Sequence, residues 1–311
     1  MPSPSHNTPQ QDCTSAFYTR TYVRRGVSFR QSRETGALTR FFLNLLAVRC
    51  LDISRRLMVL DHFRLDGKNA LVTGSHRGLG AAIAIALAEA GANVACHGRS
   101  LEPGEAPDKI RGLGRKSAYF AGDIGDASVC VSLIEKTVGE FGSIDILVNN
   151  AGIIRRAPAA EYSAADWDEV IATNMTSVFH LSQGAGRQML NQKKGGKIVS
   201  IASVLSFQGG VYVPAYAAAK GGLAQLTRAF ANEWAVYGIN VNAIAPGYMT
   251  TDNTAALRND VARNKAIVDR IPAGRWGDPW ELGGAAVFLC SAASNYVHGH
   301  VLVVDGGWLG R

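Results

Sequence analysis

From residue 68 onward, short apolar runs bounded by glycine alternate with longer stretches of helical periodicity. Continuous apolar runs of this length are typical of buried parallel strands, and the stretches between them are typical of helices that pack on the sheet. The pattern predicts seven strands, at residues 69–72, 93–97, 117–121, 144–148, 196–201, 240–245 and 301–304. We therefore expect an α/β fold with a doubly wound parallel sheet of seven strands in a single domain.

Glycines spaced Gly74-x-x-x-Gly78-x-Gly80 follow the first predicted strand and lead into an alanine-rich helix over residues 81–90. Glycine lets the backbone approach a pyrophosphate, and a helix start supplies unpaired N–H groups with a partial positive charge. A tight strand-to-helix turn also uses glycine. The position directly after the first strand favours a phosphate-binding loop.

The second predicted strand ends at Gly98 and Arg99, where a dinucleotide-binding domain reads the adenosine ribose. A carboxylate at this point would hold a free 2′-hydroxyl and repel a 2′-phosphate. Arg99, with Arg77 from the glycine-rich loop, favours a 2′-phosphate and thus NADP, although either guanidinium could face solvent or stack on adenine. Asp123, after the third strand, is placed to accept a hydrogen bond from the adenine amino group or to cap a helix.

Asn150, Ala151 and Gly152 follow the fourth predicted strand. They would lie at the carboxyl edge of the sheet, where open α/β folds bind ligands. Small residues there leave room for a ribose and a nicotinamide. An Asx turn explains the asparagines equally well, so this segment alone does not indicate catalysis.

Tyr216 and Lys220 are four residues apart in a predicted helix, so they share one face. A cation held near a phenol favours the phenolate and brings its pKa toward a useful acid/base range. Ser203, thirteen residues before Tyr216, ends a strand and could hydrogen-bond a substrate oxygen. Asn174 is a poor helix former in a helical stretch, and its side chain or a displaced backbone carbonyl could hold a water.

The composition excludes several classes of protein. With 311 residues, 47% apolar and 18% charged, the chain is not a disordered acidic protein, a collagen or a small disulfide scaffold. The formal charge of +7 suggests a polyanion partner. However, residues 1–57 contain nine arginines and three acids, so they carry +6 and the rest of the chain only +1.

We expect two parts, an arginine-rich extension at 1–57 and a nucleotide-binding domain at 58–311. The extension could be an organellar or membrane address, a nucleic-acid arm, or a leader without function ahead of a start at Met58; we expect the last, disordered or not native. The five cysteines form no CxxC pair, and no apolar run is long enough to span a bilayer. These features favour a cytoplasmic protein that binds neither nucleic acid nor a membrane.

In this order and combination, the motifs over residues 64–311 resemble the short-chain dehydrogenase/reductase family. The resemblance implies a Rossmann-type domain that moves a hydride between a nicotinamide and a carbinol or carbonyl carbon, without a metal. It implies that Tyr216 is the general acid/base, that Ser203 orients the substrate oxygen, that Lys220 binds the nicotinamide ribose and lowers the tyrosine pKa, and that Asn174 holds a proton-relay water. It also implies a homotetramer. The residues implied to bind NAD(P) are Gly74, Ser75, Arg77, Gly78, Leu79, Gly80, Arg99, Asp123, Ile124, Asn150, Ala151, Gly152, Tyr216, Lys220, Pro246, Gly247 and Thr251.

Segments 146–156, 196–210, 232–248, 270–277 and 304–309 resemble a subgroup, the 2-deoxy-D-gluconate 3-dehydrogenases and 2-dehydro-3-deoxy-D-gluconate 5-dehydrogenases. A sugar acid needs a cation and polar groups, which Arg155, Arg156 and Gln208 offer beside Ser203 and Tyr216. The subgroup is usually associated with NAD, so the choice between NAD and NADP stays open. A 3-oxoacyl or general carbonyl reductase and a non-catalytic nucleotide-sensing protein are the alternatives.

Overall fold

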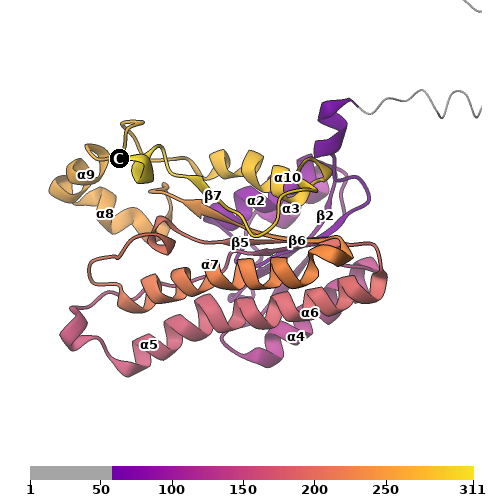
Figure 1. Ribbon diagram of the computed structural model, residues 1–311, viewed down its shortest axis with the longest axis horizontal. Helices are drawn as coiled ribbons and strands as arrows, with labels where there is room; N and C mark the ends of the chain where they lie inside the picture. The colour runs from indigo at the N-terminus through magenta and orange to yellow at the C-terminus, as the bar shows by residue number, and fades with distance from the viewer. Residues whose placement is uncertain (1–57) are drawn as a thin grey trace, which may run out of the picture. The chain divides into compact units, whose positions relative to one another are not determined.

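Seven parallel strands form one central sheet in the computed structural model, which describes residues 58–311 (Figure 1). Their order is β3-β2-β1-β4-β5-β6-β7. The predicted α/β fold with a doubly wound parallel sheet is confirmed, and each strand end lies within two residues of its predicted place. The expectations for residues 1–57 lie outside the described residues. The strands are β1 Asn69–Val72, β2 Asn93–Gly98, β3 Ser117–Ala121, β4 Ile146–Asn149, β5 Gly196–Ile201, β6 Ile239–Pro246 and β7 Val301–Val304.

Helices cover both faces of the sheet (Figure 1). On one face lie α2 (Gly78–Glu89), α3 (Ala106–Gly112) and α10 (Gly283–Cys290), and on the other lie α4 (Ala127–Phe141), α6 (Ser177–Gln192) and α7 (Pro214–Trp234). Each layer has its own apolar core, in which Ile83 and Leu289 belong to the first and Leu133 and Leu181 to the second. Burial on both faces explains why the strands read as nearly unbroken apolar runs.

The strand order reverses between β1 and β4, which are neighbours in the sheet: β2 and β3 lie on one side of this pair and β5, β6 and β7 on the other. The loops that follow these two strands are joined by hydrogen bonds. The Thr73 hydroxyl accepts from the backbone N–H groups of Asn150 and Ala151 at 3.0 and 3.1 Å, and the Asn150 amide donates to the Thr73 carbonyl at 2.9 Å. This is the switch point at which doubly wound sheets bind ligands.

Shorter helices complete the carboxyl end of the sheet. They are α5 (Ala164–Ile171), α8 (Ala255–Asn259) and α9 (Val261–Val268). The C-terminus lies beside α9 in Figure 1, and the Arg311 guanidinium donates to the Asp269 carbonyl at 3.1 Å. None of the helices in residues 58–311 combines the length and apolar character that crossing a membrane requires.

Candidate active site

A cavity of about 970 Å³ opens at the carboxyl ends of the strands. It runs from the end of β2 to the start of α7 and extends under α8 and α9. Three of the predicted site residues, Ser75, Asn174 and Arg155, do not line it. The others all do, namely Gly74, Arg77, Gly78, Leu79, Gly80, Arg99, Asp123, Ile124, Asn150, Ala151, Gly152, Arg156, Ser203, Gln208, Tyr216, Lys220, Pro246, Gly247 and Thr251.

The glycine-rich loop needs its glycines for close backbone approach. Gly74 has φ +64°, in the left-handed region that favours glycine, and a Cβ at this position would lie 2.8 Å from the Ala151 Cα. A Cβ on Gly80 would overlap the Gly74 carbonyl oxygen. The loop therefore folds tightly onto the segment after β4 and leaves the N-terminus of α2 open to the cavity.

The loop is also held from behind by Ser75 and His97. The Ser75 hydroxyl donates to the Val72 carbonyl at 2.8 Å and accepts from the His97 backbone N–H at 3.0 Å. The buried His97 ring accepts from the Gly74 N–H at Nδ1, 3.2 Å away, and its Nε2 lies 3.1 Å from the Gly122 carbonyl. Ser75 thus supports the loop and does not face the cavity.

The two arginines expected to read the adenosine ribose lie in different surroundings. Arg99 is exposed and, within residues 58–311, forms no ion pair. The Arg77 guanidinium is 2.9 Å from the Asp252 carboxylate, so a 2′-phosphate would compete with this carboxylate. His76 directly precedes Arg77 in the glycine-rich loop, and its Nδ1 is buried without a hydrogen-bond partner in residues 58–311.

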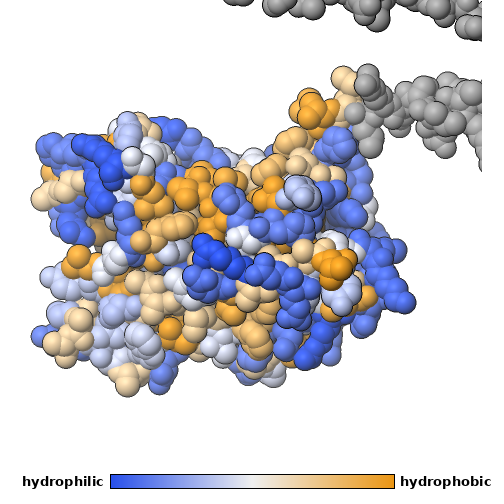
Figure 2. Space-filling model, viewed as in Figure 1, coloured by the Kyte–Doolittle hydropathy of each residue, from blue (hydrophilic) through white to orange (hydrophobic). Residues whose placement is uncertain are grey.

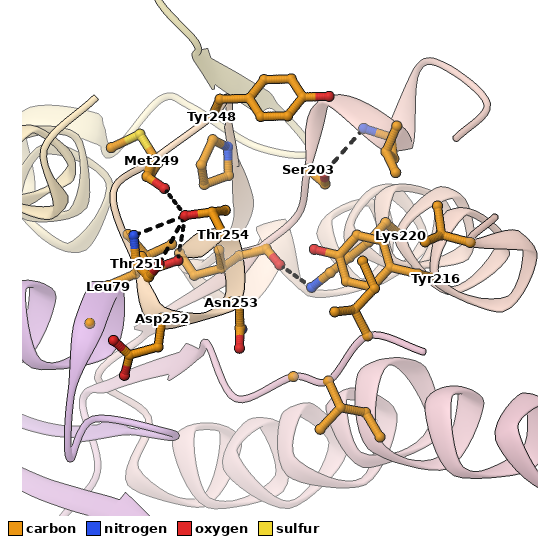
Figure 3. Close-up of a pocket in the computed structure, with 18 of the residues that line it drawn as sticks. Leu79, Ser203, Tyr216, Lys220, Tyr248, Met249, Thr251, Asp252, Asn253 and Thr254 are labelled. Carbon is orange, nitrogen blue, oxygen red and sulfur yellow. Dashed lines mark hydrogen bonds between the residues drawn. The ribbon is translucent and has the colours of Figure 1, made fainter. Parts of the chain in front are cut away.

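Tyr216, Lys220 and Ser203 meet at the opposite end of the cavity from Leu79 and Asp252 (Figure 3). The Lys220 ammonium donates to the Ile201 carbonyl at 2.6 Å and lies 5.5 Å from the centroid of the Tyr216 ring. Burial lowers the pKa of Lys220 to about 8. The cation therefore lies against the face of the phenol ring, where it is largely removed from solvent.

The pKa of Tyr216 is raised, whereas the sequence predicted that it would be lowered. Burial, the largest influence, raises the pKa of Tyr216, while the hydrogen bond to Ser203 and the charge of Arg156 lower it. Lys220 is not among the groups that lower it, because its ammonium lies over the ring and bonds to the Ile201 carbonyl. In the protein alone the phenol thus stays protonated.

Asn174 lies in a π-helical turn, Ala172–Thr176, between α5 and α6. Its fully buried side chain accepts from the Ile153 N–H at 2.8 Å and donates to the Ile153 carbonyl at 2.7 Å. Both side-chain groups are therefore engaged with the loop after β4. Of the two possibilities for holding a water, the displaced backbone carbonyl is the one that this arrangement leaves.

Adjacent arginines after β4 point to different places. The Arg155 guanidinium forms two hydrogen bonds with the Glu169 carboxylate on α5, at 2.8 and 2.9 Å, and is not brought to the cavity. Arg156 lines the cavity. Gln208 also lines it, and its Oε1 accepts from the Trp308 indole N–H at 3.0 Å.

The cavity has lining residues that the sequence did not single out. Tyr248, Arg263, Arg270 and Trp308 line the same end as Gln208. A spacing of seven between Arg263 and Arg270 places them on one side of a helical segment, which was the only available signal. Nothing in the sequence indicated toward which part of the molecule that side would face.

Comparisons with known proteins cover the part of the chain that forms this site. A family model described as enoyl-(acyl carrier protein) reductase matches residues 74–309, from the glycine-rich loop almost to the C-terminus. The chain belongs to the short-chain dehydrogenase/reductase family. It is thus an oxidoreductase that acts on CH–OH groups and uses a nicotinamide cofactor, and the non-catalytic alternative is set aside.

Relatives within the short-chain dehydrogenase/reductase family resemble the chain closely. The 2-dehydro-3-deoxy-D-gluconate 5-dehydrogenase of Dickeya dadantii is 54% identical over 254 residues, which are 82% of this chain and 100% of the relative. A candidate 2-deoxy-D-gluconate 3-dehydrogenase from Agrobacterium tumefaciens, solved with bound NADP, is 53% identical, with a TM-score of 0.76 over 81% of this chain and 100% of that chain. A gluconate 5-dehydrogenase from Burkholderia cenocepacia in complex with NADP and tartrate is 41% identical, with a TM-score of 0.78 over 82% of this chain and 100% of that chain.

Proposed function

We propose that the protein transfers a hydride between NAD(P) and a secondary alcohol or ketone of a sugar acid, of the 2-deoxy-D-gluconate or 2-dehydro-3-deoxy-D-gluconate type. The observation that carries the proposal is the position of Arg156, which lines the cavity with Ser203 and Tyr216 and is close enough for its charge to lower the pKa of that tyrosine. A cation beside the reacting hydroxyl suits an acidic substrate. The names of the Dickeya, Agrobacterium and Burkholderia relatives agree with this substrate class.

The cavity fits the cofactor because the N-terminus of α2 lines it, with the small residues Ala151 and Gly152 beside the glycine-rich loop. The glycine-rich loop would hold the pyrophosphate, Asp123 the adenine, and Lys220 the nicotinamide ribose. When bound, the nicotinamide supplies or accepts the hydride. The remaining chemistry, which is movement of a proton at the substrate oxygen, belongs to the residues of this chain.

Tyr216 is the proton donor and acceptor for that oxygen. Because burial keeps the phenol protonated, it is ready to donate during reduction of a ketone. Ser203 accepts or donates a hydrogen bond at the same oxygen and holds it beside the phenol. The side chain of Asn174 supports the loop after β4, and its backbone carbonyl in the π turn would hold the relay water.

NADP is the proposed cofactor, with NAD as the second candidate. Arg99 is exposed at the end of β2 and faces no carboxylate within the described residues, and the Agrobacterium and Burkholderia structures contain NADP. We further propose a homotetramer that works in the cytoplasm on a small-molecule substrate, without nucleic acid or a membrane as partner.

Steady-state kinetics in both directions test the function. Four substrates are compared, 2-dehydro-3-deoxy-D-gluconate, 2-deoxy-D-gluconate, D-gluconate and an acetoacetyl thioester, each with NAD and with NADP. We expect the highest kcat/KM with a sugar acid. Activity confined to the thioester would show instead a 3-oxoacyl or general carbonyl reductase.

A further inference from the structure

Three arginines from separate segments line the end of the cavity that contains Tyr248, which we call the substrate end. Arg156 lies in the loop after β4, Arg263 in α9, and Arg270 two residues beyond the end of α9. None of the three forms an ion pair with any residue from 58 to 311. In Figure 2, blue hydrophilic residues are prominent in the region of α8 and α9, with paler apolar residues among them.

Tyr248 lines the same cavity as the three arginines. Burial raises the pKa of the Tyr248 hydroxyl, and the charges of Arg263, Arg270 and Arg156 all lower it. The hydroxyl therefore has three cations in its neighbourhood. In Figure 3, Tyr248 lies at the same end of the pocket as Ser203 and far from Asp252.

Aromatic side chains fix the position of Arg270. Its guanidinium lies 4.0 Å from the centroid of the Trp308 ring, and the Trp308 indole N–H is bonded to Gln208. The Tyr248 ring packs on Trp308 with centroids 4.6 Å apart. A guanidinium stacked in this way loses less rotamer freedom when it binds a planar anion.

Helix α9 is anchored to the same aromatic group. The Trp276 indole donates to the Asn264 side chain at 2.7 Å, and the Tyr248 and Trp276 rings meet edge to face at 5.4 Å. Ile267, one turn after Arg263, is buried in the apolar cluster with Trp308. These contacts hold Arg263 over the cavity rather than leave it on a free surface helix.

The acids of the cavity do not neutralise this group. The Asp260 carboxylate accepts from the Arg263 backbone N–H at 3.0 Å, so it caps α9. Asp252 pairs with Arg77 at the other end. Like charges held together destabilise the folded protein, and an anionic ligand relieves that repulsion.

We propose that Arg263 and Arg270, together with Arg156, bind the carboxylate of the substrate at the Tyr248 end of the cavity. This inference rests on the proposed function and extends it. Arginine suits the task because its planar fork can give a carboxylate two parallel hydrogen bonds. With the carboxylate held there and the reacting hydroxyl at Tyr216 and Ser203, the distance between the two points selects the carbon that is oxidised.

The test compares an acid with its neutral counterpart. Binding of D-gluconate and of D-gluconamide to the NADP complex is measured by calorimetry, and turnover is measured at saturating NADP. The unchanged protein should bind the acid more tightly than the amide. Arg263→Gln and Arg270→Gln should each weaken the acid about tenfold in Kd and KM, since each removes a hydrogen bond between charged groups, and should leave the amide nearly unchanged.

Matched controls are available in the same segments. Lys265→Gln removes a cation from α9 that pairs with Asp269 and does not line the cavity, and Arg155→Gln removes the neighbour of Arg156 that pairs with Glu169. Both should leave the preference for the acid unchanged. Arg270→Lys, which keeps the charge but not the planar stacking, should lose part of the preference while the melting temperature stays near that of Arg270→Gln.

The outcomes separate the inference from the function. If the protein turns over sugar acids and both glutamine variants keep the full preference for the acid, the carboxylate site is wrong and the proposed function stands. If the protein neither binds nor turns over any sugar acid, the proposed function falls and this inference falls with it. Loss of the preference in Arg263→Gln, an exposed position with little influence on folding, supports the site even if Arg270→Gln is unstable.

Discussion

At the scale of single residues, Tyr216 is the group whose removal separates chemistry from binding. Tyr216→Phe keeps the ring against Lys220 but removes the proton that the substrate oxygen needs. We expect kcat/KM to fall by about 100-fold or more, in line with the usual contribution of a general acid. NADP affinity, measured by fluorescence titration, should change by less than about twofold, because the ribose contacts of Lys220 remain. Tyr237→Phe, outside the cavity, is the control; turnover retained in Tyr216→Phe would contradict the role.

Lys220 gives a prediction about pH and stability. Its pKa is lowered from 10.5 to about 8 by burial, so between these values the unfolded chain holds a proton that the folded protein has lost. Stability due to this group therefore rises with pH through that window, and the buried ammonium costs about 3 kcal/mol below it. Lys220→Met should gain stability relative to the unchanged protein below pH 8, with the gain shrinking toward pH 10.5.

Urea unfolding from pH 7 to 11 measures that difference. Lys197, whose pKa burial also lowers to about 8, is present in both proteins and cancels from the comparison. Loss of the hydrogen bond to the Ile201 carbonyl offsets part of the gain, so the test is how the difference varies with pH. A difference in the free energy of unfolding that does not vary with pH would show that Lys220 does not titrate as described.

Asp252 is expected to limit affinity for NADP through Arg77. The ion pair between them is exposed, so breaking it costs the fold little, and Asp252→Asn leaves the guanidinium for a 2′-phosphate. We expect the KM for NADP to fall about two- to threefold at low salt, and the KM for NAD to stay constant. The effect should fade as salt screens the charges. An equal change for both cofactors would show that Arg77 does not meet the 2′-phosphate.

At the scale of elements, His97 ties the end of β2 to the loops after β1 and β3. His97→Leu would leave the partly buried Gly74 N–H and Gly122 carbonyl without the ring as partner, which costs up to about 1–3 kcal/mol for each group. We expect the Kd for NADP to rise about tenfold and the melting temperature to fall. His300→Leu, with an exposed side chain, is the control.

The pH dependence distinguishes the hydrogen bonds of the His97 ring from a general contribution of this residue to stability. Burial lowers the pKa of His97 below 6.5, so the neutral ring that accepts from Gly74 persists at neutral pH. The contribution of His97 to stability and to NADP affinity is complete above pH 6.5, and it is lost as the pH falls through the lowered pKa of His97. His97→Leu should lack this acid-side loss. If both proteins lose NADP affinity in parallel on acidification, His97 is not its cause.

The sequence predicted the sheet well because its strands are buried on both faces and read as continuous apolar runs. It singled out Asn174 as a poor helix former in a helical stretch, but it did not predict the π-helical turn that the structure has there. It did not decide between Arg155 and Arg156, because that choice depends on Glu169 in a different helix. Nor did it place Arg263, since α9 buries little more than Ile267 and gives no clear apolar pattern.

At the scale of the whole molecule, the placement of single charged side chains in residues 58–311 matters more than their sum. Residues 58–311 carry a formal charge of only +1, and polar and apolar side chains are interspersed over the face in Figure 2. The cations that matter are gathered in the cavity, at the glycine-rich loop and at the substrate end. Within residues 58–311, this distribution agrees with small anionic ligands.

The proposed tetramer needs an apolar face, and α6 and α7 supply one. Between them lies a groove with Met175, Phe179, Gly222 and Leu226 in its lining, and Phe179 stacks on Phe230 at 6.1 Å. We expect Leu226→Asp to shift the protein to smaller species in analytical ultracentrifugation, because a carboxylate buried in a subunit interface costs several kcal/mol.

Val236→Asp tests whether the location of the charge matters. Val236 lies just beyond α7 and is 82% exposed, so a carboxylate there stays in water and the assembly should be unaffected. Tyr216 lies on α7, which also forms one side of the groove, so loss of assembly in Leu226→Asp should also lower kcat while the KM for NADP changes less. A monomeric unchanged protein, or a Leu226→Asp variant of unaltered size, would overturn the tetramer on this face.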